Sequence, residues 1–170
     1  MCIRDRMKLI VRGKKREFLS AVGKSLNLIL PAEANTFTKS DKLTALWLSP
    51  DEWMIFSNEF SNIDSNDYET ENLLNKNITK TNLGAVTNVT DQFVLINLKG
   101  DKIYELFETG SPFNFNDFRK KRGSVTQTIL AKIDVIIQHE SQNDVNLFVR
   151  RSFSQHLFSC CLLYTSDAAD

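Results

Sequence analysis

The side chains that most often do chemistry in proteins are few in this sequence, and they are widely spaced. The two histidines, His139 and His156, have no carboxylate at the spacing that metal ligands usually show. The six glycines never cluster, whereas a dinucleotide fingerprint or a phosphate-binding loop requires several within a few residues. No Gly-x-Ser-x-Gly pattern marks a hydrolase serine. We therefore predict no catalytic residue, no cofactor-binding residue and no metal ligand in this chain.

The three cysteines lie in or beside two terminal segments that look unlike the rest of the chain. Residues 1–6 and 160–170 resemble translated sequencing-adapter reads, so we expect both segments to be foreign to the fold. Residues 7–159 then form a single domain with two sub-halves, at about 7–90 and 91–159. This part contains no thiol, which excludes a disulfide framework and a thiolate zinc site within it. The alternative is that Cys160 and Cys161 form a genuine vicinal pair with redox or metal chemistry.

A loop rich in phenylalanine is the first candidate for contact with another molecule. Phe113, Phe115 and Phe118 lie within the sequence SPFNFNDF at Ser111–Phe118, among polar residues. Large exposed apolar patches are uncommon on monomers, so the rings could form a surface for a partner. They could equally belong to a loop that folds back onto the core. The sequence leaves both interpretations open.

Two groups of basic residues complete the candidate interface. Arg119-Lys120-Lys121-Arg122 is either a solvated surface, as most charge runs are, or a salt-sensitive contact to an acidic partner. Arg150 and Arg151 have the planar fork that suits carboxylates and phosphates, although one of the two is expected to pair within the protein. The candidate partner interface is therefore made of Phe113, Phe115, Phe118, Arg119, Arg122, Arg150 and Arg151.

Hydrophobic periodicity predicts short strands that alternate with helices. Strands are predicted over 8–12, 43–48, 53–56, 84–89, 93–98, 125–131, 133–138 and 145–149, and helices around 18–26, 69–80 and 101–110 and from 153 onward. Apolar residues on both faces of 93–98 indicate a strand that is covered on both sides. The order β-α-β-β-α-β followed by β-α-β-β-β-α predicts an α+β fold with antiparallel sheets, built as two ferredoxin-like halves.

Three local signals refine these elements. The turn Ser49-Pro50-Asp51-Glu52 predicts a hairpin that brings Trp47 and Trp53 together, either as core packing, which we favour, or as an aromatic binding surface. Gly110 is expected to cap its helix in the left-handed conformation. Ser152 and Gln155 fit a capping box at the start of the last helix.

Overall charge and hydropathy exclude several classes of partner. The chain has 170 residues, with 21 basic and 21 acidic side chains, so it has no electrostatic reason to bind nucleic acid or an anionic membrane. It contains no apolar run long enough to span a bilayer and no signal-peptide pattern after Met7. We expect a cytoplasmic protein that binds neither nucleic acid nor membrane.

A series of short motifs runs in order over about residues 30–157. The motifs are Leu30-Pro31, Asn35-Thr36, LWLSPDEWMI at Leu46–Ile55, Val89-Thr90-Asp91, Leu98-Lys99-Gly100, Gly110-Ser111-Pro112, Phe118, Thr126-Gln127-Thr128 and Leu147–Phe153. None of them is catalytic, but together they resemble one known family, the gamma subunit of heterotetrameric sarcosine oxidase. Ser111 departs from the pattern of that family, since a cysteine is expected there.

The resemblance implies a fold related to the folate-binding domain of aminomethyltransferases and to the N-terminal domain of a tRNA-modifying GTPase. It also implies a complex of sarcosine catabolism and one-carbon metabolism, which demethylates sarcosine to glycine and forms hydrogen peroxide and methylene-tetrahydrofolate. In that family FAD, FMN, NAD and folate belong to the larger subunits and zinc to the smallest. This chain is then expected to bind no cofactor and to act as a non-catalytic structural subunit beside alpha, beta and delta subunits.

Two other functions remain as alternatives. One is a free-standing folate-binding protein of the aminomethyltransferase type, although no carboxylate–aromatic set in the sequence can be assigned to a pterin. The other is a tRNA-linked domain, for which residues 119–122 are the one basic focus and which the neutral charge disfavours.

Overall fold

A computed structural model describes residues 6–58 and 66–166. The chain divides into two compact units between Asp91 and Gln92, here called the N-terminal unit and the C-terminal unit. Both are mixtures of helices with one antiparallel sheet, which confirms the predicted α+β class. No helix within the described ranges is both long enough and apolar enough to cross a bilayer.

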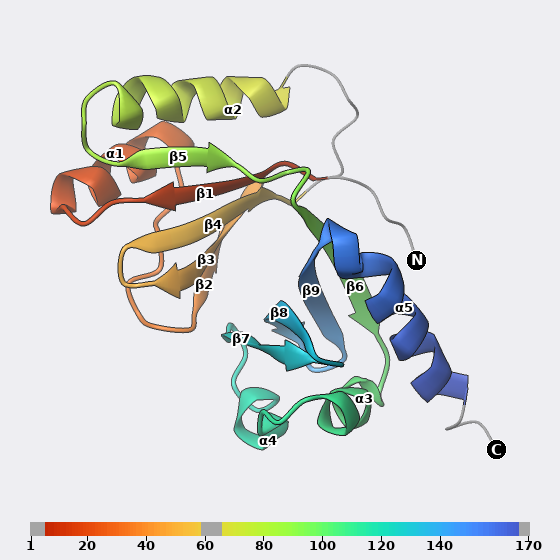
Figure 1. Ribbon diagram of the computed structural model, residues 1–170. Helices are drawn as coiled ribbons and strands as arrows, with labels where there is room; N and C mark the ends of the chain where they lie inside the picture. The colour runs from red at the N-terminus through yellow and green to blue at the C-terminus, as the bar shows by residue number, and fades with distance from the viewer. Residues whose placement is uncertain (1–5, 59–65, 167–170) are drawn as a thin grey trace. The chain divides into compact units, whose positions relative to one another are not determined.

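The N-terminal unit contains a five-stranded sheet in the order β2-β3-β4-β1-β5 (Figure 1). Without the short edge strand β2, its chain order β-α-β-β-α-β and its central first strand are those of a ferredoxin-like half. β2 has no counterpart among the predicted strands, because its segment is short and polar. The elements are β1 (Lys8–Arg12), α1 (Arg16–Leu26), β2 (Phe37–Lys39), β3 (Leu43–Ser49), β4 (Glu52–Ser57), α2 (Asn66–Leu74), the π-helix η1 (Asn75–Thr79) and β5 (Ala85–Asn88).

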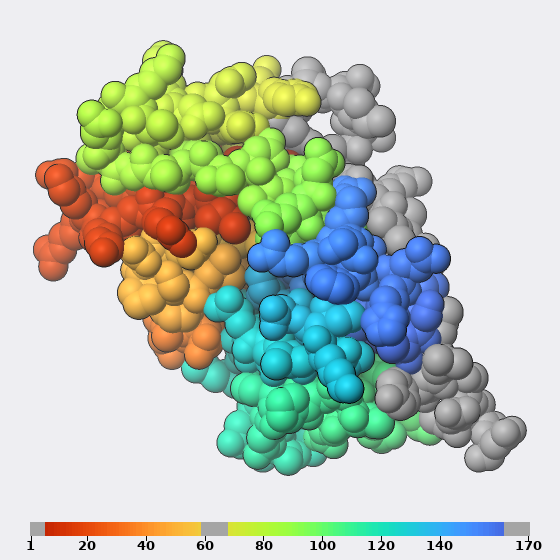
Figure 2. Space-filling model, viewed as in Figure 1, coloured from red at the N-terminus to blue at the C-terminus, as the bar shows by residue number. Residues whose placement is uncertain are grey.

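The core of the N-terminal unit lies between one face of this sheet and its helices. Alternate strand residues such as Leu9 and Val11 point to that face, as the two-residue period of a strand requires. Phe18 and Val22, four residues apart on α1, pack against them. Asn27 then ends α1 in the left-handed conformation, with φ of 49°. Figure 2 shows α2 and β5 side by side on the surface of this unit.

The C-terminal unit contains a four-stranded sheet in the order β6-β9-β8-β7, which differs from the strand order of the N-terminal unit (Figure 1). No helix separates β8 from β9, so β7, β8 and β9 form a meander and the last helix follows the sheet. The elements are β6 (Phe93–Lys99), α3 (Ile103–Gly110), α4 (Phe115–Phe118), β7 (Val125–Leu130), β8 (Ile133–Ser141), β9 (Asp144–Arg150) and α5 (Arg151–Ser166).

The helices of the C-terminal unit cover one face of its sheet. Val94 and Ile96 on β6 share that face and pack in the same cluster as Phe107 of α3 and Leu157 of α5. Leu95, which points the other way, is also buried, whereas Asn97 on the same face is exposed, so cover over both faces of the whole strand stays a prediction.

Ala131 and Lys132 join β7 to β8 through a two-residue turn in which both have positive φ, 50° and 65°. Such turns are normally made by Asn-Gly or Asp-Gly, because these residues adopt the left-handed region at little cost. The hairpin is therefore formed without the sequence signal that usually announces it.

Three details at helix ends differ from the predictions. Gly110 is not a left-handed cap; it is the last residue of α3, and a Cβ there would lie 3.1 Å from the Leu130 side chain. Its small size thus serves close packing against the β7–β8 turn. The predicted capping box is also wrong, because α5 begins at Arg151, directly after β9, and Ser152 lies within its first turn. α5 continues beyond residue 160, and Cys161 is buried against the core of the C-terminal unit.

Candidate functional site

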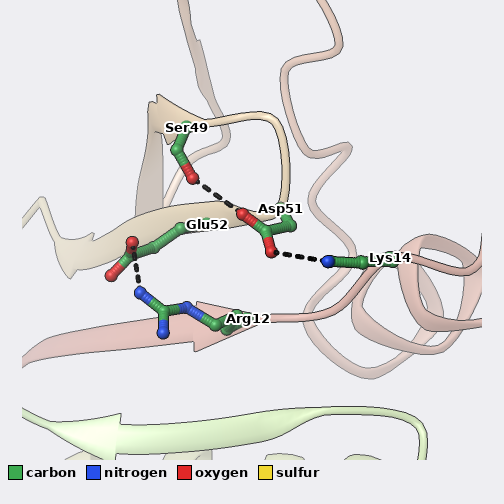
Figure 3. Close-up of polar contacts among 5 residues, drawn as sticks. All are labelled: Arg12, Lys14, Ser49, Asp51 and Glu52. Atoms are coloured by element: carbon green, nitrogen blue, oxygen red, sulfur yellow. Dashed lines mark hydrogen bonds and ion pairs between the residues drawn. The ribbon is translucent and has the colours of Figure 1, made fainter.

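The hairpin of the LWLSPDEWMIF segment uses its polar residues to brace a turn. Arg12 on β1 donates to Glu52 at 2.7 Å, and the hydroxyl of Ser49 donates to Asp51 at 2.9 Å (Figure 3). Lys14 reaches the same Asp51 carboxylate at 3.9 Å from an exposed position. All five side chains lie around one corner of the sheet, where β1 runs beside β4. Each charge has a neighbour within the protein, so this cluster stabilises the turn.

The two tryptophans of this hairpin pack within the N-terminal unit. Trp47 and Trp53 are directly opposite each other across β3 and β4, and both contact the core cluster. The Trp53 ring is 4% exposed, lies 5.8 Å from the Phe18 ring, and donates its indole N–H to the carbonyl of Pro31 at 2.8 Å. The favoured interpretation, core packing, is therefore confirmed for this pair.

The phenylalanine-rich loop folds back onto the core of the C-terminal unit. Asn114 accepts a hydrogen bond from the backbone N–H of Asn116, which starts the single turn of α4. That turn buries Phe115 completely and leaves Phe118 only 7% exposed, while Phe113 is half-buried beside them. The rings of Phe115 and Phe118 thus belong to the interior of the unit, and neither is on its surface.

Behind these rings lie two buried polar side chains, Tyr104 in the first turn of α3 and His139 on β8. Their rings are 5.9 Å apart and meet edge to face, and Phe118 contacts both. His139 is fully buried and Tyr104 is 6% exposed. Burial raises the pKa of Tyr104 to about 12, against a smaller opposing effect of the Arg119 charge. The phenol consequently keeps its proton over the whole physiological range.

The hydrogen bonds of His139 fix its tautomer. Nδ1 lies 3.1 Å from the carbonyl oxygens of both Phe118 and Lys121. Because carbonyl oxygens only accept, Nδ1 carries the hydrogen and, in the neutral ring, Nε2 is an acceptor. Within the described part of the chain, neither Nε2 of His139 nor the hydroxyl of Tyr104 has a hydrogen-bond partner, although both atoms are buried.

Both side chains line a cavity of about 450 Å³ in the C-terminal unit, here called the Tyr104–His139 cavity. Tyr104 and His139 form its buried floor, and exposed residues form its rim. The rim residues are Asp101, Glu105, Arg119, Lys120, Arg122, Gln142 and Asn143. Asn143 donates to the Asp101 carboxylate, which ties the β8–β9 turn to the start of α3.

The seven predicted interface residues do not form one surface. Arg119 and Arg122 lie at the rim of the cavity, whereas Arg150 and Arg151 lie at the opposite end of β9. The guanidinium of Arg150 sits 5.8 Å from the centre of the Phe93 ring, and the backbone N–H of Arg151 donates to the carbonyl of Gln92 at 2.8 Å. Whether any of them contacts a partner stays a prediction.

The cavity could not be predicted from the sequence, because Tyr104 and His139 stand in no recognisable motif. Tyr104 looks like one more core position on a helical stripe, and His139 is an isolated histidine in an apolar strand. Only the basic run at residues 119–122 pointed to this region. Among the described residues, no group of three or more His, Cys, Asp or Glu side chains is arranged to hold a metal ion.

Comparisons with known proteins agree with the fold and assign the family. A search of curated proteins finds no match. A solved structure, heterotetrameric sarcosine oxidase from Corynebacterium sp. U-96 in complex with pyrrole 2-carboxylate, contains a similar chain. The two chains are 18% identical in sequence and superpose with a TM-score of 0.83. The match covers 99% of the present chain and 83% of the chain in the solved structure. The model of the sarcosine oxidase gamma subunit family matches residues 12–169, and the chain therefore belongs to that family.

Proposed function

We propose that this chain is a non-catalytic structural subunit of a heterotetrameric sarcosine oxidase, which it joins with alpha, beta and delta subunits. In this proposal the whole complex demethylates sarcosine to glycine, with formation of hydrogen peroxide and methylene-tetrahydrofolate, in the cytoplasm. FAD, FMN, NAD, folate and zinc are bound by the other subunits.

The family match over residues 12–169 is the observation that carries this proposal. It favours the oxidase subunit over the free-standing folate-binding protein. The use of the polar residues in the LWLSPDEWMIF segment supports the structural role. Asp51 accepts from Ser49 of the same turn, Glu52 pairs with Arg12 on β1, and Trp53 packs in the core. The most recognisable motif of the chain thus maintains its own fold.

Co-expression with and without the other subunits tests the proposal. The chain alone is expected to produce no hydrogen peroxide from sarcosine and to purify without flavin. When all four subunits are produced together, it is expected to co-purify with them, and its omission is expected to reduce the yield of the assembled oxidase. The matched control is the complete set of four subunits, with this chain unchanged, produced under the same conditions.

Two results would contradict the structural role. One is a flavin-containing preparation of this chain that oxidises sarcosine by itself. The other is an oxidase of full yield, stability and activity assembled from the remaining subunits, because a scaffold that can be omitted without effect supports nothing.

A further inference from the structure

The buried His139 ring holds the backbone of the basic run at residues 119–122. The ring is fully buried, and its Nδ1–H is shared between the carbonyl oxygens of Phe118 and Lys121, each at 3.1 Å. Phe118 is the last residue of α4, and Lys121 lies within the run. The backbone N–H of His139 also donates to the carbonyl of Ser124, just beyond the run. A single residue of β8 therefore contacts the α4–β7 connection at three carbonyl oxygens.

The other ring nitrogen, Nε2, has no comparable contact. It is buried, and it has no hydrogen-bond partner in the described chain. The Tyr104 ring meets the His139 ring edge to face at 5.9 Å, but its enclosed hydroxyl makes no hydrogen bond to Nε2. In the neutral ring, Nε2 is an unused acceptor. A second proton would turn it into a charged donor that reaches neither water nor an acceptor, and a buried charge without a partner is much more costly than an unused neutral acceptor.

The charges around the ring do not offset that cost. Three cations and two carboxylates line the same cavity, and one of the carboxylates, that of Asp101, already accepts from Asn143. The phenol of Tyr104 keeps its proton, because burial raises its pKa to about 12. β9 places the uncharged Val145 opposite His139. The charged residues of the cavity are Asp101 before α3, Glu105 on α3, and Arg119, Lys120 and Arg122 in the basic run, and Glu140 follows His139 on β8.

We propose that His139 is a proton-sensitive latch for the basic run. While the ring is neutral, Nδ1–H holds the carbonyls of Phe118 and Lys121, and the run stays closed against β8. When the ring gains a second proton, the closed state has to bury the charge, whereas an open state exposes Nε2 to water. Protons therefore bind the open state more tightly, and linkage requires the run to open as pH falls. The placement of Arg119 and Arg122 at the cavity rim then depends on the latch.

Amide hydrogen exchange of the full chain tests the latch. The backbone N–H groups of Arg119, Lys120 and Lys121 donate to carbonyls of the α4 turn, so their protection factors report local opening. Between about pH 7.5 and pH 5, where histidines change charge, these factors are expected to fall by up to about tenfold per pH unit, the limit for one linked proton. The N–H of Ala131, which donates to Gly110 in the same unit, is the internal control and should keep its protection.

Nuclear magnetic resonance of the histidine rings connects the opening to its cause. The chain has only two histidines, so His156→Gln leaves the signals of His139 alone. The ring is expected to be the Nδ1–H tautomer at neutral pH. Its gain of a second proton is expected to occur over the same pH range in which the run loses protection. This latch concerns the C-terminal unit alone, so its test does not depend on the structural role proposed for the chain.

A variant at the latch removes the titration. The side-chain amide of Asn in His139→Asn can offer a donor close to the position of Nδ1, but it takes up no proton. Protection of the run should then be nearly independent of pH down to about pH 5, below which carboxylates titrate. His156→Gln is the matched control, because it removes the other histidine and should leave the pH dependence of the run unchanged.

Three outcomes would overturn the proposal. Protection of the run that does not change with pH in the parent chain would show that no latch opens. A pH dependence that persists in His139→Asn would assign the opening to other titrating groups. An equal loss of protection at Ala131 would show that acid unfolds the whole unit. The comparison of the run with Ala131 uses the parent chain, so it decides even where His139→Asn fails to fold.

Discussion

Trp53 and Tyr104 are both buried aromatic side chains with a polar hydrogen, and their surroundings treat that hydrogen differently. In the N-terminal unit, the indole N–H of Trp53 donates to the carbonyl of Pro31 at 2.8 Å. In the C-terminal unit, the hydroxyl of Tyr104 is equally enclosed but has no partner in the described chain. Both rings are at least nine-tenths buried, so exposure does not explain the difference.

The comparison separates a buried polar group whose hydrogen bond holds the fold from one that the fold leaves unsatisfied. Around Trp53 the neighbouring charges of the β3–β4 turn are paired as well, so that corner of the N-terminal unit is self-contained. Around Tyr104, the hydroxyl and Nε2 of the neighbouring His139 are enclosed without a partner in the described chain. Such groups are rare in folded proteins, because each one loses its hydrogen bonds to water when it is buried.

The largest effect is expected from the aromatic packing behind the cavity. Phe115 is fully buried and contacts Phe107, Tyr104 and Phe118. Phe115→Ala should lower the free energy of unfolding by about 3–5 kcal/mol, the usual cost of truncating a core phenylalanine. Urea unfolding of the full chain measures it. Phe153→Ala is the control, because that ring is 47% exposed, and it should change stability by less than about 0.5 kcal/mol. A small loss of stability in Phe115→Ala would contradict the burial of this ring.

The titration of Tyr104 gives the next effect. Its pKa is raised from 10.0 to about 12 in the folded protein, so the unfolded chain loses this proton first as pH rises. Stability is therefore retained below pH 10 and falls as pH increases toward about 12, by at most about 3 kcal/mol. Urea unfolding across this range, compared with Tyr104→Phe, isolates the contribution. Tyr68→Phe is the control, because Tyr68 is 71% exposed. A Tyr104 phenolate that forms at the ordinary pKa would contradict the burial of the hydroxyl.

Removal of the Trp53 indole N–H should lower the stability of the N-terminal unit, because this donor has a hydrogen-bond partner. Trp53→Phe deletes the N–H and leaves the carbonyl of Pro31 buried without its partner. We expect a loss of about 1–3 kcal/mol in the free energy of unfolding from the unpaired carbonyl, increased by the lost volume of the indole. Thermal and urea unfolding measure it. Trp47→Phe provides the comparison, because Trp47 lies opposite on β3 and is only partly buried. An equal loss in both variants would assign the effect to ring volume.

Elements with strong periodicity could be predicted from the sequence, and elements fixed by tertiary contacts could not. The strands at 8–12 and 145–149 and the hairpin around Pro50 follow from alternation and turn chemistry. The edge strand β2 has no apolar pattern, and it exists because β3 offers it a ladder of hydrogen bonds. The capping-box motif at Ser152 was misleading, because it requires a helix that starts at Phe153, whereas β9 runs directly into α5 and the helix starts at Arg151.

The candidate site was predictable only in its charged rim. Arg119 and Arg122 stand out in the sequence as a basic run, and they do lie at the cavity. Tyr104 and His139 come from segments about 35 residues apart, and nothing local indicates that the fold of the α3–α4 segment against β8 will bring them together. Whether a buried polar atom has a hydrogen-bond partner depends on the packed structure, so no periodicity or motif in the sequence encodes it.

The smallest effect is expected where the polar group has no partner. Tyr104→Phe removes a hydroxyl that makes no hydrogen bond in the described chain. The free energy of unfolding at neutral pH should therefore rise slightly, and it should in no case fall by more than about 0.5 kcal/mol. Unfolding by urea measures it. A large loss in the free protein would show that the fold does use this hydroxyl, and the contrast with Trp53 would disappear.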